Sequence, residues 1–71
     1  MRVALLGGGG FRTPLIHREI VDTGLAVDEI VLHDVSERRL AVMAEVLRGS
    51  GPSIRTTTEL DDAVALSLIH I

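Results

Sequence analysis

Arg2-Val-Ala-Leu-Leu-Gly-Gly-Gly-Gly-Phe-Arg-Thr-Pro14 is the stretch from which the fold of this chain can be inferred. Its aliphatic run, Val3 to Leu6, is typical of a strand that is buried on both faces. The glycines form a turn, and Thr13 followed by Pro14 predicts a helix with a hydroxyl at its N-cap. Such a succession predicts a phosphate site, because the first amides of a helix are unpaired and its dipole is positive there.

The turn matches only part of the dinucleotide-binding fingerprint, since the third glycine position falls on Arg12 or, one residue on, Thr13. We therefore predict a modified turn in which Gly9 faces the pyrophosphate. No Lys-Ser or Lys-Thr follows, which excludes a mononucleotide P-loop. The alternative is a flexible loop without a ligand. The cofactor-binding residues predicted here are Gly7, Gly8, Gly9, Gly10, Phe11 and Arg12.

The rest of the chain predicts an α/β fold, the βαβαβ first half of a Rossmann-type, doubly wound parallel sheet, here truncated. Within its first helix, His17 is interpreted as a solvated side chain. The expected elements are a helix at 13–23 ended by Gly24, a strand at 29–33, a helix at 36–48, a strand at 53–57 and a helix opened at Glu59 by a capping box of Thr58 and Asp61.

Asp34 ends the second predicted strand, 24 residues after Gly10, where a Rossmann fold holds the adenosine ribose. A carboxylate there accepts hydrogen bonds from the ribose hydroxyls and repels a 2′-phosphate, so we predict NAD rather than NADP. The alternative is that Asp34 only caps the next helix or turn. We interpret Arg38 and Arg39 as lying over the adenine or pairing with Glu37, and we include Arg39 in the cofactor site.

Composition excludes several classes of function. A net charge of −3 leaves no basic stripe for a nucleic acid, and the absence of cysteine excludes disulfides and a zinc–thiolate site. No segment is typical of a signal peptide or a membrane span. With 71 residues, the chain forms one small unit. We expect a soluble, cytoplasmic protein without a nucleic-acid or membrane partner.

Three stretches together resemble the N-terminus of the NAD- and manganese-dependent glycoside hydrolases of family four. They are residues 3–14, the Val-Asp-Glu-Ile-Val-Leu-His-Asp at 27–34 and the Thr-Thr at 57–58. This family includes phospho-glucosidases, α-galactosidases and α-glucuronidases, and the resemblance covers residues 1–65. The sequence departs from the family at Gly10, where serine is usual, and at Phe11 and Arg12, where a polar or aromatic pair is common. These departures indicate a divergent subgroup.

The resemblance implies a parent enzyme of carbohydrate metabolism that hydrolyses O-glycosidic bonds, as a 6-phospho-β-glucosidase does. In that family NAD takes a hydride from the sugar C3, a base removes the C2 proton with metal assistance, the aglycone is eliminated, water adds and the hydride returns. The implied cofactors are NAD and a divalent metal, manganese, and the parent is implied to be a homo-oligomer that binds a small glycoside.

The family's metal-ligating Cys and His and its tyrosine base belong to later parts of its chain, and this sequence contains neither cysteine nor tyrosine. We therefore assign no catalytic and no metal-binding residues, and we expect the chain alone to be inactive. Two other functions stay open: an NAD-dependent hydroxy-acid dehydrogenase and a non-catalytic nucleotide-sensing Rossmann module. Thr13-Pro14 and the Val-Asp-Glu at 27–29 favour the glycosidase.

The last six residues, Leu-Ser-Leu-Ile-His-Ile at 66–71, stand where the family continues into a fourth strand. They look like the translation of a transposon-end sequencing adapter. We therefore expect residues 1–65 to be an NAD-binding Rossmann fragment and residues 66–71 a non-native tail, with a true apolar helix or strand end as the alternative. Without a fourth strand, the sheet edge where that strand should pair is expected to be open.

Overall fold

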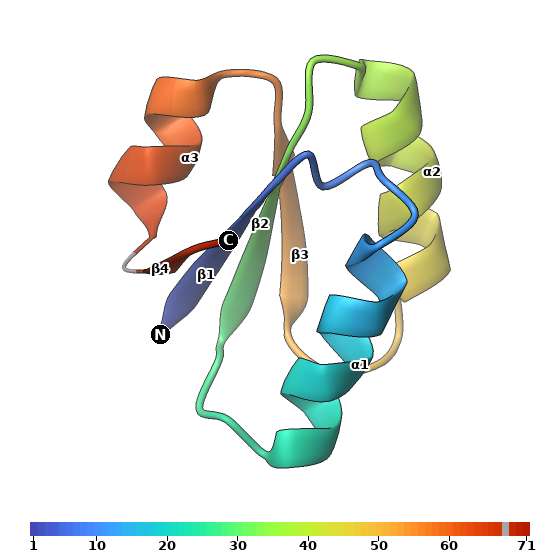
Figure 1. Cartoon of the computed structure of the whole chain (residues 1–71), viewed down its shortest axis with the longest axis vertical. Coiled ribbons are helices and arrows are strands. Elements are labelled where there is room, and N and C mark those ends of the chain that lie inside the picture. Colours follow the sequence, from blue (N-terminus) through green and yellow to red (C-terminus); the bar gives the residue numbers. More distant parts are fainter. Residues whose placement is uncertain (68) are drawn as a thin grey trace.

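A parallel sheet with the strand order β3-β2-β1-β4 runs through the molecule, and helices cover both of its faces (Figure 1). The computed structural model describes residues 1–67 and 69–71. The predicted fold class is confirmed, and so are the bounds of the second and third strands. The elements are β1 (Arg2–Leu6), α1 (Thr13–Thr23), β2 (Glu29–His33), α2 (Glu37–Leu47), β3 (Ser53–Thr57), α3 (Leu60–Leu66) and β4 (Ile69–His70).

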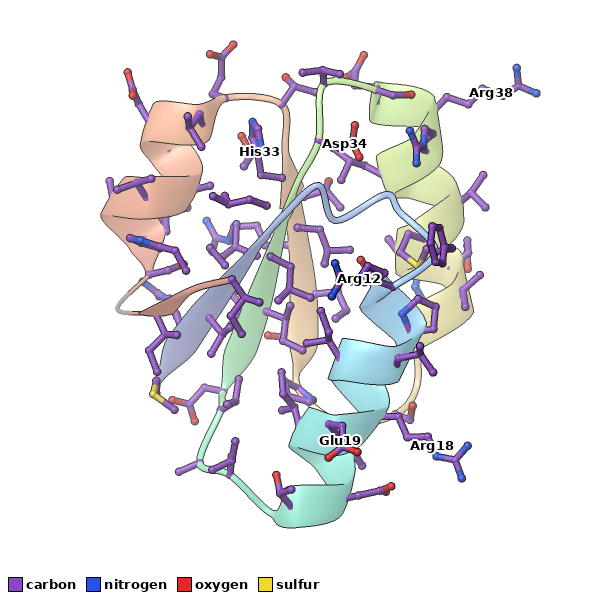
Figure 2. All side chains as sticks on the ribbon, viewed as in Figure 1. Arg12, Arg18, Glu19, His33, Asp34 and Arg38 are labelled. Atoms are coloured by element: carbon purple, nitrogen blue, oxygen red, sulfur yellow. The ribbon has the colours of Figure 1, made fainter. Side chains whose placement is uncertain are left out.

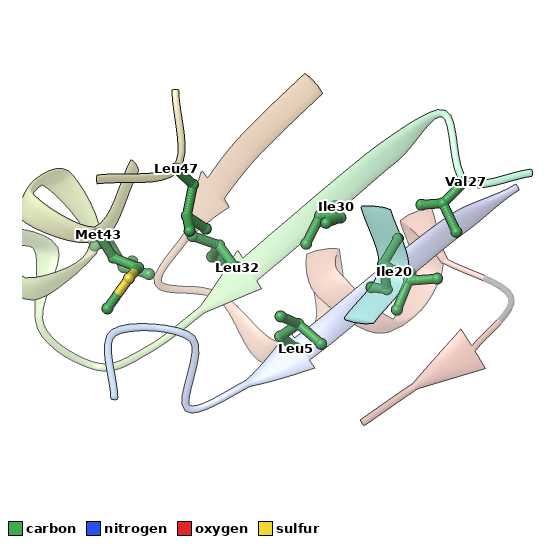
Figure 3. Packing of buried hydrophobic residues seen from close by; sticks show 9 residues of the cluster. Leu5, Ile20, Val27, Ile30, Leu32, Met43 and Leu47 are labelled. Carbon is green, nitrogen blue, oxygen red and sulfur yellow. The ribbon is translucent and has the colours of Figure 1, made fainter. Parts of the chain in front are cut away.

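Side chains of β1 and β2 alternate between two apolar layers, because successive residues of a strand point to opposite faces of its sheet. Ala4 and Val31 pack against Ala63 of α3 on one face. The larger layer joins the other face to α1 and α2 (Figure 3) and contains Val3, Leu5, Ile20, Val27, Ile30, Leu32, Leu40, Met43 and Leu47. Burial on both faces explains the uninterrupted aliphatic runs of these two strands.

The helix ends differ in part from the predicted ones. Gly24 ends α1 in the left-handed conformation with φ of 68°, as predicted. The Ser36 hydroxyl caps α2 by accepting a hydrogen bond from the Arg39 amide at 3.2 Å, which confirms the start of that helix. The predicted N-cap at Thr13 is wrong: Arg12 occupies that position, and Thr13 is a buried residue of the first turn.

The predicted capping box of α3 is also wrong. Its N-cap is Glu59, which makes no side-chain capping bond. Instead, the hydroxyl of Thr57 accepts a hydrogen bond from the Glu59 amide at 3.0 Å. Thr57 lies at the end of β3, so the strand itself supplies the hydroxyl and Thr58 is not used.

The expectation of an open edge beside β1 is wrong. Ile69 and His70 pair with Val3 and Ala4 in parallel register, and the Ile71 amide donates to the carbonyl of Ala4 at 2.8 Å. The crossover through α3 makes this pairing possible, because it carries the chain back over the sheet to the far side of β1. Leu68, which belongs to the predicted tail, lies outside the described residues.

His17 is buried, which contradicts its interpretation as a solvated side chain. Only 5% of its surface is exposed, and its Nε2 donates to the carbonyl of Ser50 at 3.0 Å. His17 follows Thr13 by four residues and precedes Ile20 by three, so the three side chains share the inner face of α1. This spacing could have identified His17 as an inward-facing residue.

Candidate functional site

The glycine turn, residues 7–10, joins β1 to α1 at the carboxyl edge of the sheet (Figure 1). Gly7 adopts φ of +77°, which a residue with a side chain rarely does. The Gly10 amide closes the turn by donating to the Gly7 carbonyl at 2.9 Å. The Gly8 amide donates to the carbonyl of His33 at 2.6 Å, so the turn folds back onto the end of β2.

Two of the glycines are required by close contacts within the protein. A Cβ on Gly8 would lie 2.8 Å from the Cβ of Leu32, and one on Gly9 would lie 2.8 Å from the Cβ of Arg39 and 2.9 Å from Oδ2 of Asp34. The sequence predicted that Gly9 has no room for a side chain because it faces the pyrophosphate. The structure shows that the obstruction comes from Arg39 and Asp34.

Asp34 lies next to the turn, directly after β2 (Figure 2). Its Oδ2 accepts a hydrogen bond from the Gly9 amide at 3.1 Å, and its Oδ1 accepts one from the Ser36 amide at 3.2 Å. The Ser36 amide, the Gly9 amide and the charge of Arg39 lower the pKa of Asp34, although burial acts in the opposite direction. The side chain is therefore an anion at neutral pH, with both oxygens directed at backbone amides.

The amides of Phe11 and Arg12 remain open at the start of α1. Neither donates a hydrogen bond to any residue in the part of the chain that the structure describes. Both follow the turn immediately, where the dipole of an eleven-residue helix is positive. Unpaired amides in this position are the groups that bind phosphate oxygens.

Phe11 and Arg12 both line a cavity of about 270 Å³. Arg12 lines it from the start of α1 and Arg39 from α2. Neither guanidinium is within 4.0 Å of a carboxylate among residues 1–67 and 69–71, so both charges are available to an anion. The predicted site residues that line this cavity are Gly7, Gly10, Phe11, Arg12 and Arg39.

Gly8, Gly9 and Asp34 support the turn without lining the cavity. The predicted pairing of Arg38 or Arg39 with Glu37 is not present among the described residues, and Figure 2 shows Arg38 directed away from the molecule. The sequence did not indicate Ile71, which lines the cavity directly after β4, because Ile71 belongs to the predicted tail.

The amino edge of the sheet differs from this site because its charged groups are paired. A cleft of about 550 Å³ at the amino edge of the sheet is lined by charged groups that neutralise one another, including Arg2 with Glu29 and the terminal ammonium with Asp28. Among residues 1–67 and 69–71, no cluster of three or more His, Asp or Glu side chains could hold a metal ion. Within the same residues, no helix has the length and apolar character to cross a membrane.

Comparison with solved structures identifies the fold. The chain superimposes on the 6-phospho-β-glucosidase of Thermotoga maritima bound to NAD and glucose 6-phosphate, with a TM-score of 0.81 and 22% identity over 90% of this chain. The fold is shared with this glucosidase. A second structure of the enzyme, with manganese, NAD⁺ and glucose 6-phosphate, gives a TM-score of 0.80 and 24% identity. A monoclinic form gives 0.72 and 21%.

The chain covers only 17% of the length of each of these glucosidase chains. No protein-family profile matches the sequence, and no curated protein does either. The structural similarity agrees with the resemblance seen in the sequence at the level of the fold.

Proposed function

We propose that this chain is the NAD-binding N-terminal part of a family-four glycosidase similar to 6-phospho-β-glucosidases. The observation that carries the proposal is the pair of open amides at Phe11 and Arg12, beside two unpaired guanidinium groups at the carboxyl edge of the sheet. The fold shared with NAD-bound glucosidases supports it. We further propose that the longer protein belongs to this family, acts on a small glycoside and forms a homo-oligomer.

The residues of this chain fit the cofactor by charge and by hydrogen bonding. The amides of Phe11 and Arg12 would donate to pyrophosphate oxygens, and the guanidinium groups of Arg12 and Arg39 would neutralise their charge. Asp34 would accept hydrogen bonds from the ribose hydroxyls with the lone pairs that its two backbone contacts leave free. NAD, when bound, would supply reversible hydride exchange with the sugar.

The chain itself offers no described ligand set for manganese, so we assign the metal to the longer protein and derive no step through it. We likewise assign the catalytic base and the glycoside-binding residues to the longer protein. The task of this chain is to bind the dinucleotide and fix its orientation. Exclusion of a 2′-phosphate by the Asp34 anion would favour NAD over NADP.

Titration of the ¹⁵N-labelled chain with NAD tests the binding site directly. We expect saturable shifts of the Gly10, Phe11 and Arg12 amide signals and weaker binding of NADP under the same conditions. Shifts confined to the amino edge of the sheet, or no saturable change, would contradict the site. Glu37→Gln provides a matched control, since it removes an exposed carboxylate from the start of α2 without touching the turn.

Assay of the longer protein tests the glycosidase. We expect release of nitrophenol from 4-nitrophenyl β-glucoside 6-phosphate that requires both NAD and Mn²⁺. Oxidation of a 2-hydroxy acid with net accumulation of NADH, without glycoside cleavage, would instead identify a dehydrogenase. Binding of NAD without either reaction would leave the sensor module as the function.

A further inference from the structure

Asp34 contacts the glycine turn in a way that a ribose-binding role does not require. We propose that Asp34 is a positioning residue for the phosphate-binding turn: its carboxylate holds the Gly9 amide and thereby keeps the Phe11 and Arg12 amides in place for a phosphate. The inference rests on the proposed function, because it concerns the same site. It adds that the Gly9 amide does not itself bind phosphate.

Two consecutive amides attach the turn to the end of β2. Gly8 donates to the His33 carbonyl at 2.6 Å, and Gly9 donates to Oδ2 of Asp34 at 3.1 Å. Four glycines provide no side chains that could anchor the turn by packing. Its position therefore depends on these backbone contacts, and the one made by Gly9 ends on a charged group, which makes it the stronger kind of hydrogen bond.

The carboxylate is itself fixed from its other side. Oδ1 of Asp34 accepts from the Ser36 amide at 3.2 Å, and the Ser36 hydroxyl accepts from the Arg39 amide at 3.2 Å to cap α2. Asp34 therefore connects the turn to the start of α2. Only 7% of its surface is exposed, whereas a carboxylate that served an incoming ribose alone would need its oxygens open to solvent beforehand.

The amides around the turn fall into two groups. Those of Gly8, Gly9 and Gly10 have protein acceptors and hold the turn in shape. Those of Phe11 and Arg12 have no acceptor among the described residues. If the contact between Gly9 and Asp34 were lost, the turn could move away from β2, and the two open amides would no longer be held in place.

Inorganic pyrophosphate separates this role from ribose binding, because it contains no ribose. Asp34→Asn and Glu37→Gln each remove one negative charge near the site, so electrostatics alone predicts tighter pyrophosphate binding for both. If Asp34 positions the turn, Asp34→Asn should instead weaken pyrophosphate binding. We expect its affinity to fall by about tenfold, as for the loss of one charge-assisted hydrogen bond, in titrations at constant ionic strength that follow the Phe11 and Arg12 amides.

For Glu37→Gln we expect affinity for pyrophosphate that is unchanged or slightly tighter. Equal or tighter binding by Asp34→Asn would overturn the proposal. Weakened NAD binding combined with normal pyrophosphate binding would also overturn it, because that pattern would restrict Asp34 to the ribose.

A second measurement uses the unmodified chain and is independent of how well the variant folds. We expect a through-hydrogen-bond correlation between the ¹⁵N of Gly9 and the ¹³Cγ of Asp34. Hydrogen exchange at Gly9 should be at least about tenfold slower than at Phe11 and Arg12. Fast exchange at Gly9 without this correlation would overturn the inference. A chain that shows the bond but binds neither NAD nor pyrophosphate would contradict the proposed function instead.

Discussion

The two edges of the sheet differ in how their charged side chains are paired. At the amino edge, Glu29 lies between Arg2 and Arg55, with Nε–Oε1 distances of 3.2 and 3.3 Å. At the carboxyl edge, Arg12 and Arg39 have no carboxylate partner among the described residues. Charges at the first edge are neutralised within the protein, whereas those at the second are available to a ligand.

Backbone amides show the same contrast. The Ser53 amide at the amino edge donates to the Asp28 carbonyl at 3.2 Å, while the amides of Phe11 and Arg12 at the carboxyl edge remain open. Unpaired polar groups are costly where water is excluded, and a site that binds anions keeps them exposed and aligned. The difference predicts that substitutions at the carboxyl edge alter cofactor binding and that those at the amino edge alter only stability.

Gly9→Val should have the largest effect of all. The new side chain would meet Arg39 and Asp34 at under 3 Å, so the turn must shift away from α2. We expect a loss of roughly 2–4 kcal/mol in the free energy of unfolding and no measurable NAD binding. Urea denaturation and NAD titration check these effects, and normal NAD affinity for the variant would contradict our account of the turn.

The sequence predicted the fold well because short-range patterns determine it. Aliphatic runs, Ser36 and Gly24 marked the strands and helix ends correctly. The chemistry of the turn was predicted less well, because it depends on which neighbour an amide meets. Nothing in the order of residues indicates that Gly9 donates to Asp34, 25 positions away, and the pairing of Ile69 with β1 depended on the path of α3.

His17→Ala should have the next largest effect, and it should act on stability alone. The hydrogen bond from His17 to the Ser50 carbonyl connects α1 to the loop before β3. The substitution removes this bond together with a buried side chain. We expect a loss of about 1–3 kcal/mol in the free energy of unfolding and an unchanged NAD dissociation constant for the folded chain. Exposed Arg18, substituted by Ala, is the matched control on the same helix.

Acid should reduce the contribution of Asp34 to stability. The pKa of Asp34 is lower in the folded chain than its ordinary value, so its contribution is complete above about pH 4 and is lost as the pH falls through the folded pKa. We expect Asp34→Asn to be less stable than the unmodified chain by about 1–2 kcal/mol at pH 7. The difference should shrink at pH 2.5, and a constant difference would contradict the charged hydrogen bond.

Glu29→Gln should have the smallest effect, and it tests the contrast between the edges most directly. The Glu29 side chain is 17% exposed, while those of Arg2 and Arg55 are about half exposed, so solvent screens both ion pairs. Glutamine retains an oxygen acceptor, and we expect a loss of roughly 0.2–1 kcal/mol in the free energy of unfolding that diminishes in high salt. NAD affinity should be unchanged because Glu29 lies at the opposite edge from the turn. A change in NAD dissociation constant of more than about threefold, which corresponds to roughly 0.6 kcal/mol, would show that the two edges are coupled through β2.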